Sequence, residues 1–203
     1  MNLNDLPFNW FDVLVLVMLV AGIFRGRARG LSQELFTMLL WIVLIFACSL
    51  AYVPLGDALT SVAPLSKLFC YILCYLVVAG LLALLFIPIK RAMGQKLISA
   101  DSFGKAEYYV GMPAGAVRFL CVLIAGLALL NARSYTKAEI LADRKYQEDV
   151  YGSEFFPGLS TLQTDVFANS LSGPYIKQYL DFLLITPTAP ENKPLRRAEA
   201  KFM

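Results

Sequence analysis

A six-residue basic segment between two long apolar runs constrains this chain more than any other feature. The segment is Arg25-Gly26-Arg27-Ala28-Arg29-Gly30, and the apolar runs on either side cover residues 8–24 and 31–53. Leaving three arginines in hydrocarbon has a high energetic cost, so we expect the chain to leave a membrane and re-enter it here. Short loops rich in Lys and Arg remain cytoplasmic, and Arg25, Arg27 and Arg29 therefore also predict an orientation.

The composition of the whole chain indicates a membrane protein. Of its 203 residues, 58% are hydrophobic and 16% are charged, whereas soluble domains average about 45–50% and about 25%. Two further apolar runs, at 68–89 and 108–132, reach the length of about 20 residues that crosses a bilayer. We therefore predict an all-α, polytopic membrane protein in which residues 1–132 form four transmembrane helices.

The first apolar run is predicted to be a retained helix. It is short for a hydrocarbon core of roughly 30 Å and would require local thinning of the bilayer. A cleaved signal peptide carries basic residues before its apolar run, whereas residues 1–9 contain no Lys or Arg. The basic residues follow the run instead, which favours a helix whose N-terminus lies outside.

The basic residues alternate between the predicted loops. Residues 25–30 contain three Lys or Arg, residues 54–67 contain one, and residues 90–107 contain four. This alternation predicts cytoplasmic, periplasmic and cytoplasmic loops, with both termini in the periplasm. Basic residues just after the fourth run favour the opposite orientation: Arg133, Lys137, Arg144 and Lys145.

The last third of the chain is polar and predicted to lie outside the membrane. Residues 133–203 carry nine basic and nine acidic residues, and this balance argues against a nucleic-acid partner. Residues 133–185 are predicted to form short amphipathic helices, one opened by a Thr136–Glu139 capping box. These helices would pack together, on the membrane surface or on a partner. Residues 186–203, rich in proline and charge, are predicted to be a disordered tail.

Three charged residues lie within or at the rim of the predicted spans: Asp12, Glu34 and Arg118. Such residues usually face the interior of a helix bundle and pair with one another. Glu34 and Arg118 both fall toward the cytoplasmic side, so we predict an ion pair between the second and fourth helices. The alternative is that each side chain snorkels independently to the membrane surface. Asp12 falls toward the outer side and should reach neither of them.

Glycines recur at a spacing of four residues in the first and fourth apolar runs. Small residues at this spacing allow two helix backbones to approach closely in lipid. The spacing predicts either a contact between subunits or packing within one chain, and a flexible turn is the alternative for Gly26–Gly30. The glycines concerned are Gly22, Gly26, Gly30, Gly111 and Gly115.

The sequence offers no candidate catalytic, cofactor-binding or metal-ligating residue. The chain has no histidine, which removes the commonest general base and metal ligand. Its four cysteines all lie in apolar runs, where they are interpreted as packing residues. We therefore expect a protein that is not an enzyme and needs no cofactor.

Several of these segments, taken in order, resemble the CvpA family, named for the colicin V production protein of bacterial inner membranes. Asn9-Trp10-Phe11-Asp12 is similar to the family's opening Trp-x-Asp, and the basic segment followed by Ser32-Gln33-Glu34-Leu35 is similar to its loop and second helix. Residues 107–118 resemble its Gly-x-x-x-Gly-x-x-Arg entry to the fourth helix, with Glu107 in place of the usual Asp. Phe119 departs from the Gly that often follows the Arg. The resemblance covers residues 8–132.

The resemblance implies a four-helix inner-membrane protein that supports colicin V production or export and envelope homeostasis. We expect it to act through protein–protein contacts, with the lipid bilayer, other inner-membrane or periplasmic proteins, or a second copy of the chain as partners. The alternative is a small transporter or channel subunit whose intramembrane charges line a polar path.

Overall fold

The computed structural model describes residues 8–99, 104–151 and 158–189, and the secondary-structure elements of this part of the chain are α-helices and 3₁₀ turns. Four long helices come first: α1 (Trp10–Arg29), α2 (Leu31–Val62), α3 (Lys67–Ser99) and α4 (Glu107–Asn131). Three shorter helices follow: α5 (Lys137–Tyr151), α6 (Leu159–Phe167) and α7 (Ser172–Leu180). Two 3₁₀ turns complete the described elements, η2 (Gly104–Ala106) and η3 (Asp181–Leu183). The predicted all-α class is confirmed.

Three helices among the described residues are long and apolar enough to cross a membrane. They are α2, the Lys67–Ala92 part of α3, and α4. Helix α1 has 20 residues but contains Asp12 and three arginines, and it does not qualify as a span by composition. The structure thus supplies three of the four expected spans by composition and length alone.

The helices extend beyond the predicted apolar runs. Helix α2 continues through Pro54 to Val62, and α3 continues through Pro88 to Ser99. Proline is tolerated inside membrane helices because neighbouring groups can satisfy the freed backbone carbonyl. The basic segment is helical up to Arg29, so Gly26 lies inside α1 rather than in a flexible turn. Only Gly30 breaks the helix, with a φ of 76° that glycine adopts without strain.

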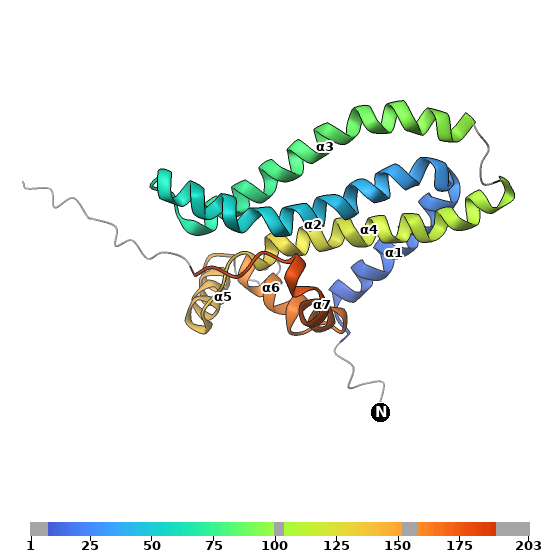
Figure 1. Ribbon diagram of the computed structural model, residues 1–203. Helices are drawn as coiled ribbons and strands as arrows, with labels where there is room; N and C mark the ends of the chain where they lie inside the picture. Colours follow the sequence, from blue (N-terminus) through green and yellow to red (C-terminus); the bar gives the residue numbers. More distant parts are fainter. Residues whose placement is uncertain (1–7, 100–103, 152–157, 190–203) are drawn as a thin grey trace, which may run out of the picture.

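The long helices pack in two antiparallel pairs, α1 against α4 and α2 against α3, and α2 also contacts α4. Figure 1 shows α5, α6 and α7 grouped near the beginning of α1 and the end of α4. The basic turn between α1 and α2 lies at the opposite end. Helix α3 packs on α2 and is otherwise largely exposed.

The C-terminal helices share one core with the spans. The buried cluster includes Phe11 of α1, Tyr52 of α2 and Leu127 of α4, together with Val166 of α6 and Ile185. The boundary predicted at residue 132 therefore does not separate two cores in the structure.

The predicted disordered tail also begins differently from expectation. Residues 186–189 are held against the bundle by two backbone hydrogen bonds of Thr188. The amide of Thr188 donates to the carbonyl of Ala132, and the carbonyl of Thr188 accepts from the amide of Ser134. Residues 190–203 lie outside the described part of the chain.

Candidate functional site

The glycines of α1 and α4 face one another along the antiparallel contact between these helices. A Cβ placed on Gly22 would lie 2.7 Å from the carbonyl oxygen of Gly115, and one placed on Gly115 would lie 2.8 Å from the Cα of Gly26. A Cβ on Gly26 would meet the carbonyl of Gly111, and one on Gly111 would approach Gly30. All five predicted glycines thus lie at this one contact within the chain, where a methyl group has no room.

The close approach of α1 to α4 brings the basic turn to the beginning of α4. A Cβ on Gly30 would lie 2.7 Å from the Cγ of Glu107, the first residue of α4. Because Gly30 reverses the chain within one residue, the first turn of α2 starts beside α4 as well. Glu34 lies in that first turn.

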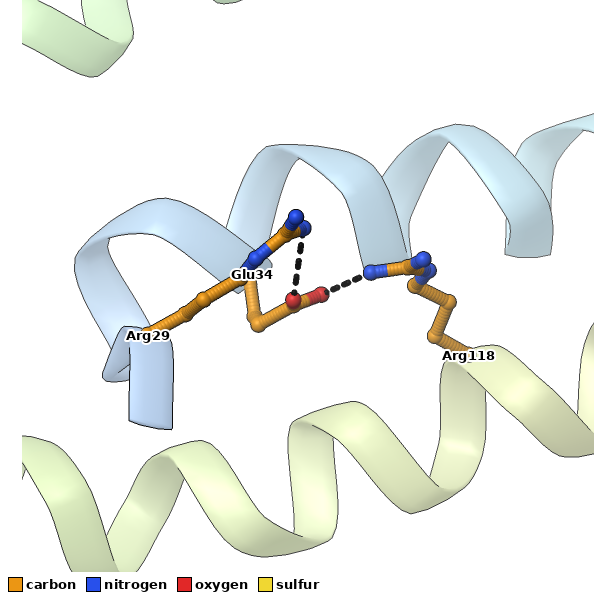
Figure 2. A network of polar contacts seen from close by, with 3 residues as sticks. All are labelled: Arg29, Glu34 and Arg118. Carbon is orange, nitrogen blue, oxygen red and sulfur yellow. Dashed lines mark hydrogen bonds and ion pairs between the residues drawn. The ribbon is translucent and has the colours of Figure 1, made fainter. Parts of the chain in front are cut away.

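Glu34 is fully buried, with 0% of its side chain exposed, and it pairs with two arginines. Its Oε2 accepts a hydrogen bond from Nη1 of Arg118 over 2.6 Å, and its Oε1 accepts one from Nη1 of Arg29 over 3.2 Å. Figure 2 shows the carboxylate between the two guanidinium groups. The structure therefore brings the predicted partners Glu34 and Arg118 together and adds Arg29, which belongs to the basic segment. We call these three residues the charge triad.

The charge triad joins three helices. Arg29 is the last residue of α1, Glu34 lies in the first turn of α2, and Arg118 lies three turns into α4. The Arg118 side chain is only 14% exposed, and its guanidinium also stands 5.2 Å from the centre of the Phe119 ring. Phe119 is the residue that stands where a Gly often follows the Arg in the family that the sequence resembles. Its ring provides a cation–π contact to Arg118. Removing one member of a buried ion pair is costly because the partner charge is left uncompensated.

The other two arginines of the basic segment are not part of the triad. Arg25 and Arg27 are exposed, and the described residues contain no ion-pair partner for either of them. Arg27 lines an open groove of about 500 Å³ together with Phe24, Tyr108 and Tyr109. The basic segment therefore contains one arginine that pairs with a buried carboxylate, Arg29, and two that are exposed, Arg25 and Arg27.

Asp12 lies at the opposite end of α1, far from the triad, and it connects α1 to α7. Its carboxylate accepts hydrogen bonds from the backbone amides of Asn9, Leu171 and Ser172 over 2.9–3.0 Å. It also accepts one from the hydroxyl of Ser172 over 2.6 Å. A single carboxylate thus caps the beginning of two helices that lie about 160 residues apart in sequence. Sequence reasoning placed Asp12 at this end but missed its partners.

Further polar contacts attach the C-terminal segment to the same end of the bundle. The hydroxyl of Tyr52 lies 3.0 Å from that of Thr186 and accepts a hydrogen bond from the Thr186 backbone amide. The side-chain amide of Asn131 donates to the carbonyl of Ile185 over 3.0 Å. Tyr52 lies near the end of the apolar run 31–53 and Asn131 at the end of α4. A polar group at the end of an apolar segment is the sequence signal that could have identified them.

The described residues contain no catalytic or metal-binding constellation. No group of three or more potential metal ligands gathers in this part of the chain. The four cysteines are buried and not disulfide-bonded. The arrangement holds helices together through the buried ion pairs of the charge triad and through the close backbone contact of α1 with α4.

A comparison with protein families identifies the chain. The family model described as colicin V production protein matches residues 11–164, about three quarters of the sequence. The chain belongs to the colicin V production family. The match includes the triad, the glycine contact and Asp12, and it continues past residue 132 into α6, further than the resemblance found in the sequence. No curated protein and no solved structure matches the chain significantly.

Membership of the colicin V production family and the apolar helices together indicate a multi-pass inner-membrane protein linked to colicin V production. The family is not known for an enzymatic activity. The CvpA resemblance inferred from the sequence is thus confirmed at the level of the family.

Proposed function

We propose that this member of the colicin V production family is a non-enzymatic inner-membrane scaffold that supports toxin production or export and envelope homeostasis through contacts with other proteins. The observation that carries the proposal is the charge triad. Its buried carboxylate is neutralised by Arg29 and Arg118 within one chain. The polar groups in the spans therefore serve to fix the arrangement of helices, as expected of a scaffold.

Helix α1 is proposed as the fourth membrane-embedded helix. The part of α1 before its arginines, residues 10–24, measures about 22 Å, so the bilayer would thin locally around it. One face packs its glycines on α4. The exposed residues between positions 13 and 24 are apolar: Val13, Leu14, Leu16, Val17, Val20, Ile23 and Phe24. Lipid is the medium that suits such a surface. The proposed orientation keeps the basic turn cytoplasmic and both termini periplasmic.

The proposed surface for partners within the membrane is α3. The glycine faces of α1 and α4 are already used within the chain, so they do not supply this surface. Only 6% of the apolar window of α3 is buried, and its exposed side includes Leu81, Leu84 and Leu85. A partner helix, from another inner-membrane protein or a second copy, would pack on this side.

A transporter or channel subunit remains the second candidate, and one observation favours it. The Nε of Arg118 and the hydroxyl of Thr37, one turn after Glu34, are buried without a hydrogen-bond partner among the described residues. Unpaired polar groups next to the triad would suit a passing ion or water. Against this role, Glu34 and Asp12 have all of their carboxylate oxygens engaged.

Photo-crosslinking from α3 tests the scaffold proposal. A photoreactive amino acid placed at Leu84 should form a defined protein adduct in membranes of cells that secrete colicin V. The matched control is Leu50 of α2, which is also strongly exposed but lies outside the proposed surface. Adducts at Leu84 that disappear together with toxin secretion when α3 is altered would support the scaffold. Lipid adducts alone at both positions would contradict it.

Arg118→Gln distinguishes the two candidates. The comparison is made under conditions in which the variant remains folded. A scaffold should then lose its α3 adduct, whereas a transporter should keep the adduct and lose ion flux in proteoliposomes.

A further inference from the structure

We propose that α7 and η3 form an interfacial segment that lies in the membrane boundary and buries an aromatic face in lipid. The partner of this face is thus the bilayer itself. The inference is independent of the proposed scaffold role and of orientation. It depends on α2 crossing the membrane and, for the height estimate, on the membrane-embedded α1 proposed above. Three observations carry it: the distribution of side chains on α7, a ring contact to α2, and the height of this contact along the spans.

The side chains of α7 and η3 divide into three groups. Gly173 is buried against the end of α6 and Leu183 in the core, while Lys177 and Asp181 are exposed and charged. Tyr175 and Tyr179, four residues apart, share a third face, and Phe182 follows them by one turn. These three rings are 59–66% exposed. A helix with separate apolar, aromatic and charged faces is typical of the membrane interface, where Tyr rings place an apolar body in lipid and a hydroxyl in the headgroups.

The aromatic face is continuous with the lipid-facing surface of α2. The ring of Phe182 packs on the ring of Phe46, with their centroids 6.2 Å apart. Phe46 lies inside a helix that is apolar enough to span the membrane, and about half of its side chain is exposed. A ring in contact with Phe46 therefore meets the same hydrocarbon.

Two helices give consistent estimates of the height of this segment above the basic turn. Along α2, Phe46 is 15 residues beyond Leu31, about 22 Å at 1.5 Å per residue. Along α1, Asp12, which binds the amide of Ser172 at the beginning of α7, is 18 residues before Gly30, about 27 Å. With a hydrocarbon core of roughly 30 Å that begins at the basic turn, Phe46 lies about 8 Å and Asp12 about 3 Å inside its far boundary. Trp10 is half exposed at the same end of α1, as expected of an aromatic belt.

Fluorescence quenching in vesicles tests this placement. Trp10→Phe and Trp41→Phe together provide a background without tryptophan, into which Tyr179→Trp or Phe182→Trp is introduced separately. The matched control is Lys177→Trp, on the charged face of the same helix. Each purified protein is reconstituted into phosphatidylcholine–phosphatidylglycerol vesicles with brominated or ordinary acyl chains, and iodide is present on both sides of the membrane.

The reporters at positions 179 and 182 should emit at shorter wavelength and lose intensity in brominated vesicles, whereas the reporter at 177 should be quenched by iodide. The proposal is overturned if 179 and 182 are quenched by iodide as strongly as 177 and are unaffected by bromine. That result would mean that the aromatic face is open to water in the isolated protein and awaits a soluble partner. Because two independent positions are tested, one variant that fails to fold does not decide the outcome.

Discussion

Arg118 of α4 and Glu34 of α2 are joined by a 2.6 Å hydrogen bond across 84 residues of sequence. The carboxylate is fully buried and has a second cation, Arg29, on its other side. The pair therefore sits where the basic turn, the glycine contact and two spans converge.

Exchanging the charges of the triad tests whether its electrostatics hold the helices together. Arg118→Gln alone should lower the free energy of unfolding by about 3 kcal/mol, since a buried carboxylate keeps only Arg29. Exchanging only Glu34→Arg and Arg118→Glu should fail as well, because the arginine placed at position 34 would face Arg29. The triple exchange with Arg29→Glu restores the charge pattern and should recover stability, measured by thermal unfolding in detergent. A triple variant no more stable than Arg118→Gln would contradict an electrostatic role.

A methyl group added at the α1–α4 contact should separate these helices. Gly115→Ala places a Cβ 2.8 Å from the Cα of Gly26 and should cost about 1–3 kcal/mol through overpacking. The matched control is Gly126→Ala on the same helix, where nothing lies within 4 Å of the new Cβ. The control should be neutral or stabilising, because alanine favours helix by about 1 kcal/mol over glycine. Thermal unfolding of both proteins checks this, and equal effects would mean that the contact is not tight.

Removing the Asp12 carboxylate should release α7 from α1. Asp12→Ala leaves the amides of Leu171 and Ser172 without their acceptor and should cost about 1–2 kcal/mol, as the loss of a helix cap does. Hydrogen exchange at residues 171–175 should accelerate, while exchange in α2 should not change. Asp181→Ala serves as the control, since Asp181 is exposed near the end of the same helix. Unchanged exchange at 171–175 in Asp12→Ala would show that α7 is held by apolar packing alone.

The beginning of α5 should loosen at low pH. The Glu139 carboxylate accepts hydrogen bonds from the backbone amide and hydroxyl of Thr136, and these bonds lower the pKa of Glu139 below its usual value. A lowered folded-state pKa means that the capping interaction is fully present above the unfolded pKa of about 4.3. It is lost as the pH falls through the folded pKa.

Hydrogen exchange at residues 137–141 checks this pH dependence. Exchange, corrected for its intrinsic pH dependence, should accelerate as the pH falls below about 4. Glu139→Gln keeps a capping side chain that does not titrate, so its corrected exchange should stay constant over the same range. An equal response of the two proteins would assign the effect to other groups.

The membrane character and helical class were predictable because they depend on local composition. Apolar runs of about 20 residues form helices in lipid wherever they occur, since unsatisfied backbone groups are too costly there. The contact between Glu34 and Arg118 was also predictable from the sequence. Two opposite charges that lie at a similar depth in the membrane, on different helices, have few other partners. The same reasoning could not find Arg29, which counted as a loop residue. It became part of the triad because α1 remains helical up to Gly30.

The contacts of the C-terminal segment were out of reach for a different reason. Asp12 and Ser172, or Tyr52 and Thr186, are ordinary residues at unremarkable spacings, and no local pattern marks them as partners. The boundary at residue 132 was drawn where composition changes, yet Ile185 is completely buried in the core that the spans form. Composition predicts whether a segment prefers lipid or water, but it does not predict which segments contact one another.

The sequence by itself determined that this chain is a helical membrane protein of the colicin V production family, because hydrophobicity, charge placement and short motifs are local properties. Only the tertiary structure decided that the basic turn is part of a three-helix charge triad and that the C-terminal helices complete the core. Those outcomes depend on which backbones can approach closely. That in turn follows from glycines on two helices meeting in register, a relationship that becomes visible only in three dimensions.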